Sequence, residues 1–337
     1  MITVGQYVER ISAVFDEAEL FYGHGTDNGY DEAVYLVFAS LDISFDDPSA
    51  YAREISPQDR EIVDARVEER ISKRTPVAYL VGQAWFGGMR FIADARALIP
   101  RSPLAEFIAG GCVPFVTIPP RRILDLCCGG GCIGLFAAHQ FPQAKIVLAD
   151  LSADALALAQ ENIALHKAAA RVSTLQSDLF AALEGRFDLI LSNPPYVPLD
   201  EMLDLPSEYR HEPALGLVSD DDGLAIPLKI LREAPDYLAD DGVLIMEVGY
   251  SHEQLSERLI EVPLLWLEFA NGGEGVFAIT RDELLRYREQ FKSCILEGFY
   301  YWSISSSLSI SNSELGNRLR HQRRPRELVL HLFVSND

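Results

Sequence analysis

The stretch that decides the fold is DLCCGGGCIG, residues 125–134, which follows the apolar run RILDL and opens a helical pattern. Gly129, Gly131 and Gly134 stand at the spacing G-x-G-x-x-G, in which glycines adopt conformations closed to other residues and let a ligand approach the main chain. Asp150 ends the next apolar run, KIVLAD, where a carboxylate can accept hydrogen bonds from a ribose diol. The stretch therefore predicts a site for an adenosine-bearing cofactor, and both a dinucleotide and S-adenosylmethionine fit it.

From Arg122 onward, apolar runs and helical patterns alternate. Beyond RILDL, the runs that read as strands are KIVLAD, VSTLQ, FDLIL, VLIMEV, LLWLEFA and GVFAIT. Such alternation predicts a parallel sheet covered by helices on both faces. The last two runs are separated only by NGGE, which is too short for a crossover and predicts an antiparallel hairpin. The predicted fold class is α/β, a Rossmann-like sheet that is parallel except for one antiparallel hairpin strand.

Acidic residues recur at the ends of the predicted strands. Asp178 follows VSTLQ and is suited to accept a hydrogen bond from the adenine amino group, with Leu179 against the ring. A lone aspartate at a strand end more often serves a turn or a cap, so this interpretation depends on the series formed with Asp125 and Asp150. Because ligands of open α/β sheets bind at the carboxyl ends of the strands, we expect these residues to meet there.

The motif Asn193-Pro194-Pro195-Tyr196 follows FDLIL and so belongs to the same edge of the sheet. Proline fixes its own backbone and favours an extended preceding residue, so two prolines make a stiff platform. The platform holds two acceptors, the Asn193 side-chain oxygen and the Pro194 carbonyl, which together can receive both hydrogens of a planar NH₂ group. An amide nitrogen is a poor nucleophile, and two acceptors raise its electron density and aim it at a sulfonium methyl. Tyr196 offers a ring that packs against the substrate and excludes water.

The glycine loop, the strand-end acids and NPPY together resemble the protein-glutamine methyltransferases, which act on peptide release factors and on a ribosomal protein. The resemblance extends over residues 1–291 and includes RTPVAYL, AWFGG, LPSEYRHEPALGL and NGGEGVF. Where the release-factor branch usually has IPRPxTE, this chain has IPRSPLAE, which favours the branch acting on the third large-subunit ribosomal protein. The resemblance implies a protein-glutamine methyltransferase that uses S-adenosylmethionine and takes a basic large-subunit ribosomal protein as its substrate.

The resemblance also assigns roles to individual residues. The catalytic residues that it implies are Asn193, Pro194, Pro195 and Tyr196. The residues that it implies for cofactor binding are Asp125, Cys127, Cys128, Gly129, Gly130, Gly131, Asp150, Asp178, Leu179 and Asn193. Members usually have Gly-Thr or Cys-Thr where this chain has Cys127-Cys128, and Ser or Thr at Gly130. We expect these small substitutions to preserve the pocket and to weaken cofactor affinity.

The net charge of the chain is −21 and it is unevenly distributed. Residues 292–337 hold six Lys/Arg and four Asp/Glu, so the first 291 residues carry −23. This charge discourages binding to nucleic-acid phosphates and suits capture of a basic partner, because complementary fields accelerate encounter. We therefore expect a basic protein substrate and no direct binding of nucleic acid.

The chain divides into four predicted parts. These are a helical substrate-docking domain at 1–75, a β-hairpin linker at 76–101, an adenosylmethionine-dependent methyltransferase domain at 102–291, and an atypical C-terminal tail at 292–337. The hairpin is centred on Gly87-Gly88, and Ser102-Pro103 predicts the start of a helix. Within the tail, one short strand is predicted near Leu328–Val334.

Further expectations concern solubility and metals. Five cysteines, three of them in CCGGGC, are too few for a disulfide framework, and without a second Cys/His cluster we expect no metal site. The sequence contains no run of 18 apolar residues and its acidic N-terminus is unlike a secretory signal, so we expect a soluble cytoplasmic monomer with no membrane segment. His24 lies in the polar stretch YGHGTDNG and is expected to be solvated.

Three alternatives stay open. An adenine methyltransferase acting on RNA or DNA would also use NPPY, which serves exocyclic amines, but it would need a basic track for phosphates. A nicotinamide-dependent dehydrogenase would use the glycine loop and Asp150 and would leave NPPY without a purpose. A non-catalytic ribosome-assembly factor would keep the shape of the pocket without binding S-adenosylmethionine.

Overall fold

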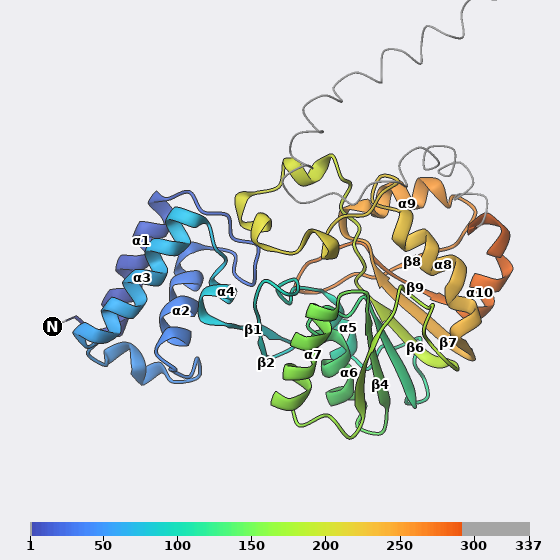
Figure 1. Cartoon of the computed structure of the whole chain (residues 1–337), viewed down its shortest axis with the longest axis horizontal. Helices are drawn as coiled ribbons and strands as arrows, with labels where there is room; N and C mark the ends of the chain where they lie inside the picture. Colours follow the sequence, from blue (N-terminus) through green and yellow to red (C-terminus); the bar gives the residue numbers. More distant parts are fainter. Residues whose placement is uncertain (1, 292–337) are drawn as a thin grey trace, which may run out of the picture. The chain divides into compact units, whose positions relative to one another are not determined.

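The computed structural model describes residues 2–291, which contain a seven-stranded sheet (Figure 1). The strands are β3 Arg122–Leu126, β4 Lys145–Asp150, β5 Val172–Gln176, β6 Phe187–Ser192, β7 Leu238–Glu247, β8 Leu265–Trp266 and β9 Val276–Thr280. They stand in the order β5-β4-β3-β6-β7-β9-β8. Strands β3 to β7 pair in parallel, and β9 runs antiparallel to both β7 and β8. The predicted parallel sheet with an antiparallel hairpin is confirmed.

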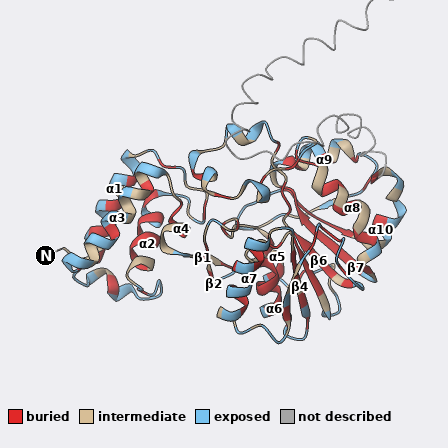
Figure 2. Cartoon of the chain, in the orientation of Figure 1, coloured by how far each residue is buried: buried red, intermediate tan, exposed pale blue. Residues whose placement is uncertain are grey.

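Helices cover both faces of this sheet. They are α5 Leu104–Ala109, α6 Cys132–Gln140, α7 Ala153–Leu165, α8 Ala225–Tyr237, α9 His252–Arg258 and α10 Arg281–Arg286. One core cluster joins α5, α6 and α7 to the sheet, and a second joins α8, α9 and α10 to it. Successive residues of a strand enter opposite clusters, as Ile123 and Leu124 do, because side chains alternate across a strand. The central strands β3, β6, β7 and β9 are therefore largely buried on both faces (Figure 2), which explains their continuous apolar runs, whereas β5 and β8 at the edges are more exposed.

Four helices precede the sheet: α1 Val4–Glu17, α2 Gly29–Ser40, α3 Pro57–Lys73 and α4 Val77–Val81, with a 3₁₀ turn η1 at Pro48–Ala52. A capping box starts α1, since the Thr3 hydroxyl accepts from the Gln6 N–H and the Gln6 side chain accepts from the Thr3 N–H. The apolar faces of these helices form a third core cluster around residues such as Phe15 and Phe38. The predicted helical character of the N-terminal residues is confirmed.

The segment between these helices and the sheet differs in part from the prediction. Residues 77–81 form the helix α4, so the extended chain predicted there was wrong. The packing of Val77 and Ala78 into the N-terminal core decides the conformation, because a five-residue apolar run fits a helix or a strand equally well. The predicted hairpin is confirmed but short, with β1 Gln83–Phe86 and β2 Met89–Ile92 paired across Gly87-Gly88.

Arg70, on α3, ties the N-terminal helices to the loop that follows the NPPY motif. That loop contains the 3₁₀ turns η2 Glu201–Leu203, η3 Ser207–His211 and η4 Ala214–Gly216. The Arg70 guanidinium donates to Glu32 at 2.5 Å, to Glu208 at 3.0 Å and to the Phe21 carbonyl at 2.9 Å. Arg70 is only 1% exposed, so both carboxylates are needed to compensate its buried charge. The loop is thereby fixed against α2 and α3.

Two further predictions concern segment ends. The predicted helix is confirmed, but α5 begins at Leu104 with Pro103 as its N-cap, one residue later than the Ser102 cap that Ser102-Pro103 predicts. Ser102 Oγ still accepts from the Leu104 N–H at 3.2 Å. The strand predicted near Leu328–Val334 lies outside the described residues. Between residues 2 and 291, no helix is long and apolar enough to cross a membrane.

Candidate active site

A cavity of about 320 Å³ lies at the carboxyl edge of the sheet, where β3, β4, β5 and β6 end. The predicted site residues that line it are Cys127, Cys128, Gly129, Gly130, Asp150, Asp178, Leu179, Asn193, Pro194, Pro195 and Tyr196. Asp125 and Gly131 do not line the cavity; both are buried next to the glycine loop. The structure thus brings the glycine loop, two of the strand-end acids and NPPY around one space.

The glycine loop turns sharply between β3 and α6. Cys127, Gly129 and Gly131 all have positive φ angles, of 60°, 52° and 81°. A Cβ atom on Gly131 would lie 2.7 Å from Leu148, so a larger residue does not fit there. Cys127 occupies the left-handed region although it is not a glycine, which costs a residue with a Cβ atom about 1 kcal/mol or more.

Asp150 ends β4 and fixes the same loop. Its Oδ2 accepts from the Gly129 N–H at 2.8 Å, and its Oδ1 accepts from the Ser152 N–H at 2.9 Å. Burial raises the pKa of this carboxyl, while the bonds from Ser152 and Gly129 lower it. Each oxygen keeps a free lone pair, so the carboxylate at the cavity wall can accept from further hydroxyl groups.

Asp125, the last polar residue of β3, is fully buried. Its Oδ2 accepts from the Gly134 N–H at 2.7 Å, whereas its Oδ1 has no hydrogen-bond partner among the residues that the structure describes. Burial, with the nearby Asp150, raises the pKa of Asp125 to about 8. Asp125 therefore supports the glycine loop from behind the cavity wall, and at neutral pH it is mainly protonated.

The far end of the cavity is formed by the residues after β5. Asp178 is largely exposed, and one of its oxygens lies 3.2 Å from the Lys229 ammonium. Leu179 is buried at the cavity wall with a φ of 49°. Sequence reasoning missed Lys229, which reaches the cavity from α8 and holds Asp178 in place.

The NPPY platform is held from several sides. Ser192, just before it, donates its hydroxyl to the Leu126 carbonyl at 2.7 Å, which joins the ends of β6 and β3. The Tyr196 carbonyl accepts from the Ser251 hydroxyl at 2.8 Å. Pro194 and Pro195 are buried, and burial raises the pKa of the Tyr196 phenol, which stays protonated. These contacts hold the platform at the wall of the cavity.

Sequence reasoning also missed Glu247, the last residue of β7. Glu247 is 5% exposed, and it accepts from the Ser102 hydroxyl at 2.5 Å and from the Tyr196 hydroxyl at 3.3 Å. Burial raises the pKa of Glu247 to about 7. A second cavity, of about 290 Å³, opens beside it and is lined by Tyr196, Tyr250 and Glu274 among others. The one sequence signal for Glu247 is an acid at the end of the apolar run VLIMEV.

The buried carboxylate of Glu212 contacts several residues beside the cavity. It accepts two bonds from Arg101, both 2.6 Å long, and one from the Ile99 N–H at 2.9 Å. His24 Nε2 lies 3.5 Å from it, and His24 is 6% exposed, so the prediction that His24 is solvated was wrong. Although burial opposes ionisation, the interactions with His24 and Arg101 lower the pKa of Glu212 to about 2. Arg101 also lies over the Tyr209 ring, 5.2 Å from its centre.

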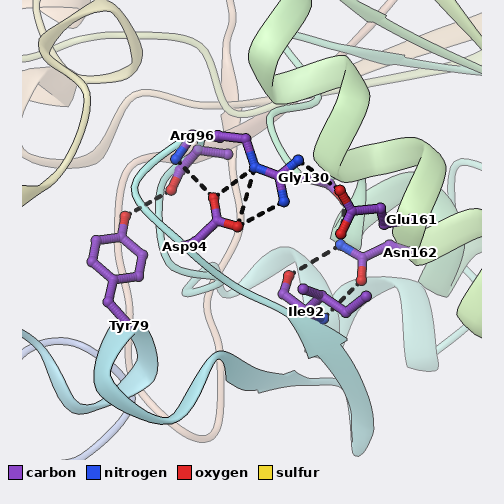
Figure 3. A network of polar contacts seen from close by, with 8 residues as sticks. Tyr79, Ile92, Asp94, Arg96, Gly130, Glu161 and Asn162 are labelled. Carbon is purple, nitrogen blue, oxygen red and sulfur yellow. Dashed lines mark hydrogen bonds and ion pairs between the residues drawn. The ribbon is translucent and has the colours of Figure 1, made fainter.

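A polar network joins the hairpin to the glycine loop (Figure 3). Asn162, on α7, donates to the carbonyls of Ile92 and Gly130 at 3.2 Å and 3.0 Å and accepts from the Ile92 N–H at 2.7 Å. Beside it, Arg96 bonds Asp94 and Glu161. The residues before the sheet therefore support the glycine loop. The sequence pattern did not indicate this support.

The cysteines of the loop are free thiols: Cys127, Cys128 and Cys132 all line the cavity. Burial raises the pKa of each of them. They therefore remain protonated and act as small apolar groups. Within the described part of the chain, no group of three or more His, Cys, Asp or Glu side chains could hold a metal ion.

Comparison with known proteins places this cavity in a family. Residues 114–203 match the family model described as Methyltransferase small domain. A ribosomal protein uL3 glutamine methyltransferase from Francisella tularensis subsp. tularensis is 40% identical over 294 residues, 86% of this chain and 94% of the relative. One from Xanthomonas campestris pv. campestris is 48% identical over 277 residues, 81% of this chain and 89% of the relative. Among solved structures, a methyltransferase from Pyrococcus furiosus matches 67% of this chain and 99% of its own, with 17% identity and a TM-score of 0.40.

The span matched by the methyltransferase model contains the glycine loop, Asp150, Asp178 and the NPPY motif. The two relatives match far beyond that span, and the alignments cover nearly their whole lengths. At 40% and 48% identity over 86% and 81% of its length, this chain belongs to the family of ribosomal protein uL3 glutamine methyltransferases.

Proposed function

We propose that the protein transfers a methyl group from S-adenosylmethionine to the side-chain amide nitrogen of a glutamine in ribosomal protein uL3. The observation that carries this proposal is the position of NPPY in the wall of the same cavity as the glycine loop and Asp150. Membership of the uL3 glutamine methyltransferase family supports the choice of substrate.

The residues of the cavity fit S-adenosylmethionine. Asp150 has lone pairs for the ribose hydroxyls, and Asp178 and Leu179 stand where the adenine would bind. The backbone from Cys127 to Gly130 lines the cavity and is open to it. When bound, S-adenosylmethionine supplies an electrophilic methyl group on its sulfonium.

The chain's own residues would prepare the glutamine. The Asn193 Oδ1 and the Pro194 carbonyl accept the two hydrogens of its NH₂ group, which orients the nitrogen and raises its electron density. Tyr196 packs against the side chain and keeps water out. No base is required before the transfer, because the methylated nitrogen loses its extra proton readily afterwards.

The rim of the cavity suits a basic polypeptide. Leu203, Leu215 and Tyr250 are 60%, 55% and 81% exposed, and Leu215 and Tyr250 line the cavity itself. Acidic side chains interleave with these apolar ones, as Asp200 and Asp204 do on either side of η2. Exposed apolar groups among acids favour a basic protein over a phosphate backbone.

The N-terminal helices are proposed to dock the protein substrate. They contact the rim through the Arg70 network and through the segment that carries His24. The division of the chain into a docking part at 1–75, a linker at 76–101 and a catalytic part at 102–291 rests on this proposal.

The test is a transfer assay with labelled S-adenosylmethionine and three substrates: uL3, a release factor and unmodified ribosomal RNA. We expect label on one glutamine of uL3, and at least a hundredfold loss of transfer in Asn193→Ala, which removes one of the two acceptors, with a much smaller loss of cofactor binding. An Asn271→Ala variant, at an exposed asparagine outside the cavity lining, serves as the control and should retain full transfer. Label on the RNA instead of uL3 would establish the adenine methyltransferase alternative. An absence of cofactor binding would leave the assembly-factor alternative.

A further inference from the structure

The register of the sheet brings Glu247 beside Asn193. Strands β6 and β7 are parallel, and Ser192 pairs with Met246 at their carboxyl ends. The next residue of each strand is Asn193 in one case and Glu247 in the other. The two side chains therefore emerge side by side at the edge of the sheet where ligands bind.

The Glu247 carboxylate is surrounded by hydrogen-bond donors. Ser102 donates to Oε2 at 2.5 Å and Tyr196 donates to Oε1 at 3.3 Å. An ionised carboxylate accepts on both oxygens and donates nothing, so it favours the NH₂ end of a neighbouring amide over the oxygen end. The interaction with the Asn193 side chain lowers the pKa of Glu247, which is the effect of a donated hydrogen bond.

The orientation of Asn193 matters because an amide has two unlike ends. With its oxygen towards the substrate, Asn193 accepts from the glutamine NH₂; turned over, it would present NH₂ against NH₂. We propose that Glu247 is a positioning residue for methyl transfer: its carboxylate holds the NH₂ group of Asn193 and leaves the Asn193 oxygen facing the substrate amide. This inference rests on the function proposed above.

The same contact strengthens the acceptor. A hydrogen bond from Asn193 Nδ2 to a charged carboxylate draws electron density through the amide towards Oδ1, since neighbouring hydrogen bonds polarise one another. Asn193 Oδ1 then accepts more strongly from the glutamine nitrogen. Glu247 thus acts on the reacting nitrogen through Asn193 and on the substrate-facing ring through Tyr196, without touching the substrate.

The ionisation of Glu247 sets the pH range of this effect. Burial raises its pKa to about 7, against the bonds from Ser102, Tyr196 and Asn193 and the charge of Arg101, which lower it. The other ionisable groups facing it are Cys132, in the lining of the first cavity, and Tyr250 and Glu274, which line the second cavity with it. Protonation puts a donor on Glu247 and weakens its hold on Asn193, so kcat should rise with pH through about 7.

The experiment compares Glu247→Gln with wild type across pH 5.5–9 in full-length protein with uL3 as the substrate. We expect a wild-type kcat that rises with a midpoint near pH 7, as the Glu247 pKa requires. In Glu247→Gln, we expect a kcat at pH 8 that is about tenfold or more lower and no longer rises near pH 7, with an unchanged KM for S-adenosylmethionine. Glu253→Gln removes an exposed carboxylate of α9 that lines neither cavity, and it should leave the kcat and its pH profile unchanged.

A second variant keeps Glu247 and moves its titration. Ser102→Ala removes a bond that lowers the Glu247 pKa, so the midpoint of the kcat profile should shift to higher pH while the plateau stays close to wild type. A purely structural role for Glu247 would not move that midpoint. An unshifted profile in Ser102→Ala, or wild-type kcat in Glu247→Gln, would overturn the inference.

Nuclear magnetic resonance tests the contact without turnover. The side-chain amide signals of Asn193, assigned by their loss in Asn193→Ala, should shift with a midpoint near pH 7 in wild type and stay constant in Glu247→Gln. If wild type methylates no glutamine, the proposed function fails, and this titration still tests the contact. If wild type methylates glutamine but its Asn193 signals show the same pH dependence as those of Glu247→Gln, only the present inference fails.

Discussion

The Asn162 side chain donates to the carbonyl of Gly130 at 3.0 Å, and this bond holds the glycine loop against α7 (Figure 3). Asn162 is 1% exposed and also satisfies the N–H and the carbonyl of Ile92. Asn162→Ala leaves three partly buried backbone groups without this partner, so we expect it to lower the free energy of unfolding by about 2–4 kcal/mol. We also expect weaker binding of S-adenosylmethionine, because the loop loses its support. Urea unfolding and calorimetric titration measure the two effects.

The neighbouring Glu161 provides the control for that prediction. Glu161 bonds Arg96 at 2.6 Å, but its side chain is 48% exposed. An exposed ion pair adds little to stability, so Glu161→Gln should leave both the free energy of unfolding and the cofactor affinity close to wild type. Equal losses in the two variants would mean that Asn162 has no special part in holding the loop.

Gly130 and Gly131 are adjacent, but the same substitution should destabilise the protein much more at Gly131 than at Gly130. Gly131 has a φ of 81°, and a Cβ there would meet Leu148 at 2.7 Å. We expect Gly131→Ser to lower the free energy of unfolding by about 2 kcal/mol or more, through backbone strain and the clash. A Cβ on Gly130 would meet Leu158 at 3.4 Å, an ordinary contact, so Gly130→Ser should change stability by about 0.5 kcal/mol at most. Thermal unfolding of the two variants measures both changes in stability. Similar losses in Gly130→Ser and Gly131→Ser would contradict the prediction.

The local parts of the site were predictable from sequence and the long-range parts were not. The glycine loop, Asp150 and NPPY each follow a strand directly, so the strand pattern alone puts them at one edge of the sheet. Glu247 meets Ser102 across 145 positions of the chain, and no spacing rule connects residues so far apart.

The two wrong predictions, a solvated His24 and an extended chain at residues 77–81, have the same origin. His24 stands in a polar stretch that is typical of a solvated loop, yet Glu212, far along the chain, buries it. The short helix α4 takes its conformation from the core that it joins rather than from its own sequence. Both errors follow from tertiary contacts that a local pattern does not contain.

Asp125 should make the stability of the protein depend on pH. Its folded-state pKa is raised from 3.8 to about 8, so the folded state favours the protonated form. The stability that this form contributes is complete below about pH 3.8 and is lost progressively as pH rises towards 8. Asp125→Asn stays neutral and keeps an oxygen for the Gly134 N–H, so its stability relative to wild type should increase between pH 5 and 8, by at most about 1.4 kcal/mol per pH unit.

Urea unfolding of both proteins at pH 5, 6.5 and 8 without ligand measures that difference. S-adenosylmethionine should reduce this difference at pH 8, because positive charge in the cavity, across the glycine loop from Asp125, favours the ionised form of Asp125. A difference that does not change with pH would show that Asp125 is ionised throughout this range.

Glu212 is the opposite case, a buried carboxyl whose pKa is lowered from 4.5 to about 2. Its ionised form contributes stability that is complete above about pH 4.5 and is lost as pH falls towards 2. At pH 7, Glu212→Gln leaves the Arg101 charge uncompensated, and we expect a loss of about 2–4 kcal/mol in the free energy of unfolding. The entrance to the cavity should loosen with it, raising the KM for the protein substrate more than the KM for S-adenosylmethionine.

The matched control for Glu212→Gln is Glu69→Gln, which removes a carboxylate from an exposed pair with Lys73 at 3.2 Å. That pair contributes about 1 kcal/mol at most, so Glu69→Gln should unfold like wild type at both pH 7 and pH 3. The difference in the free energy of unfolding between wild type and Glu212→Gln should be smaller at pH 3 than at pH 7. At pH 3 the Glu212 carboxyl of unfolded wild type is protonated, which favours the unfolded state. A gap that stays constant from pH 7 to pH 3 would mean that packing, and not the charge on Glu212, holds Arg101 and His24 at the entrance.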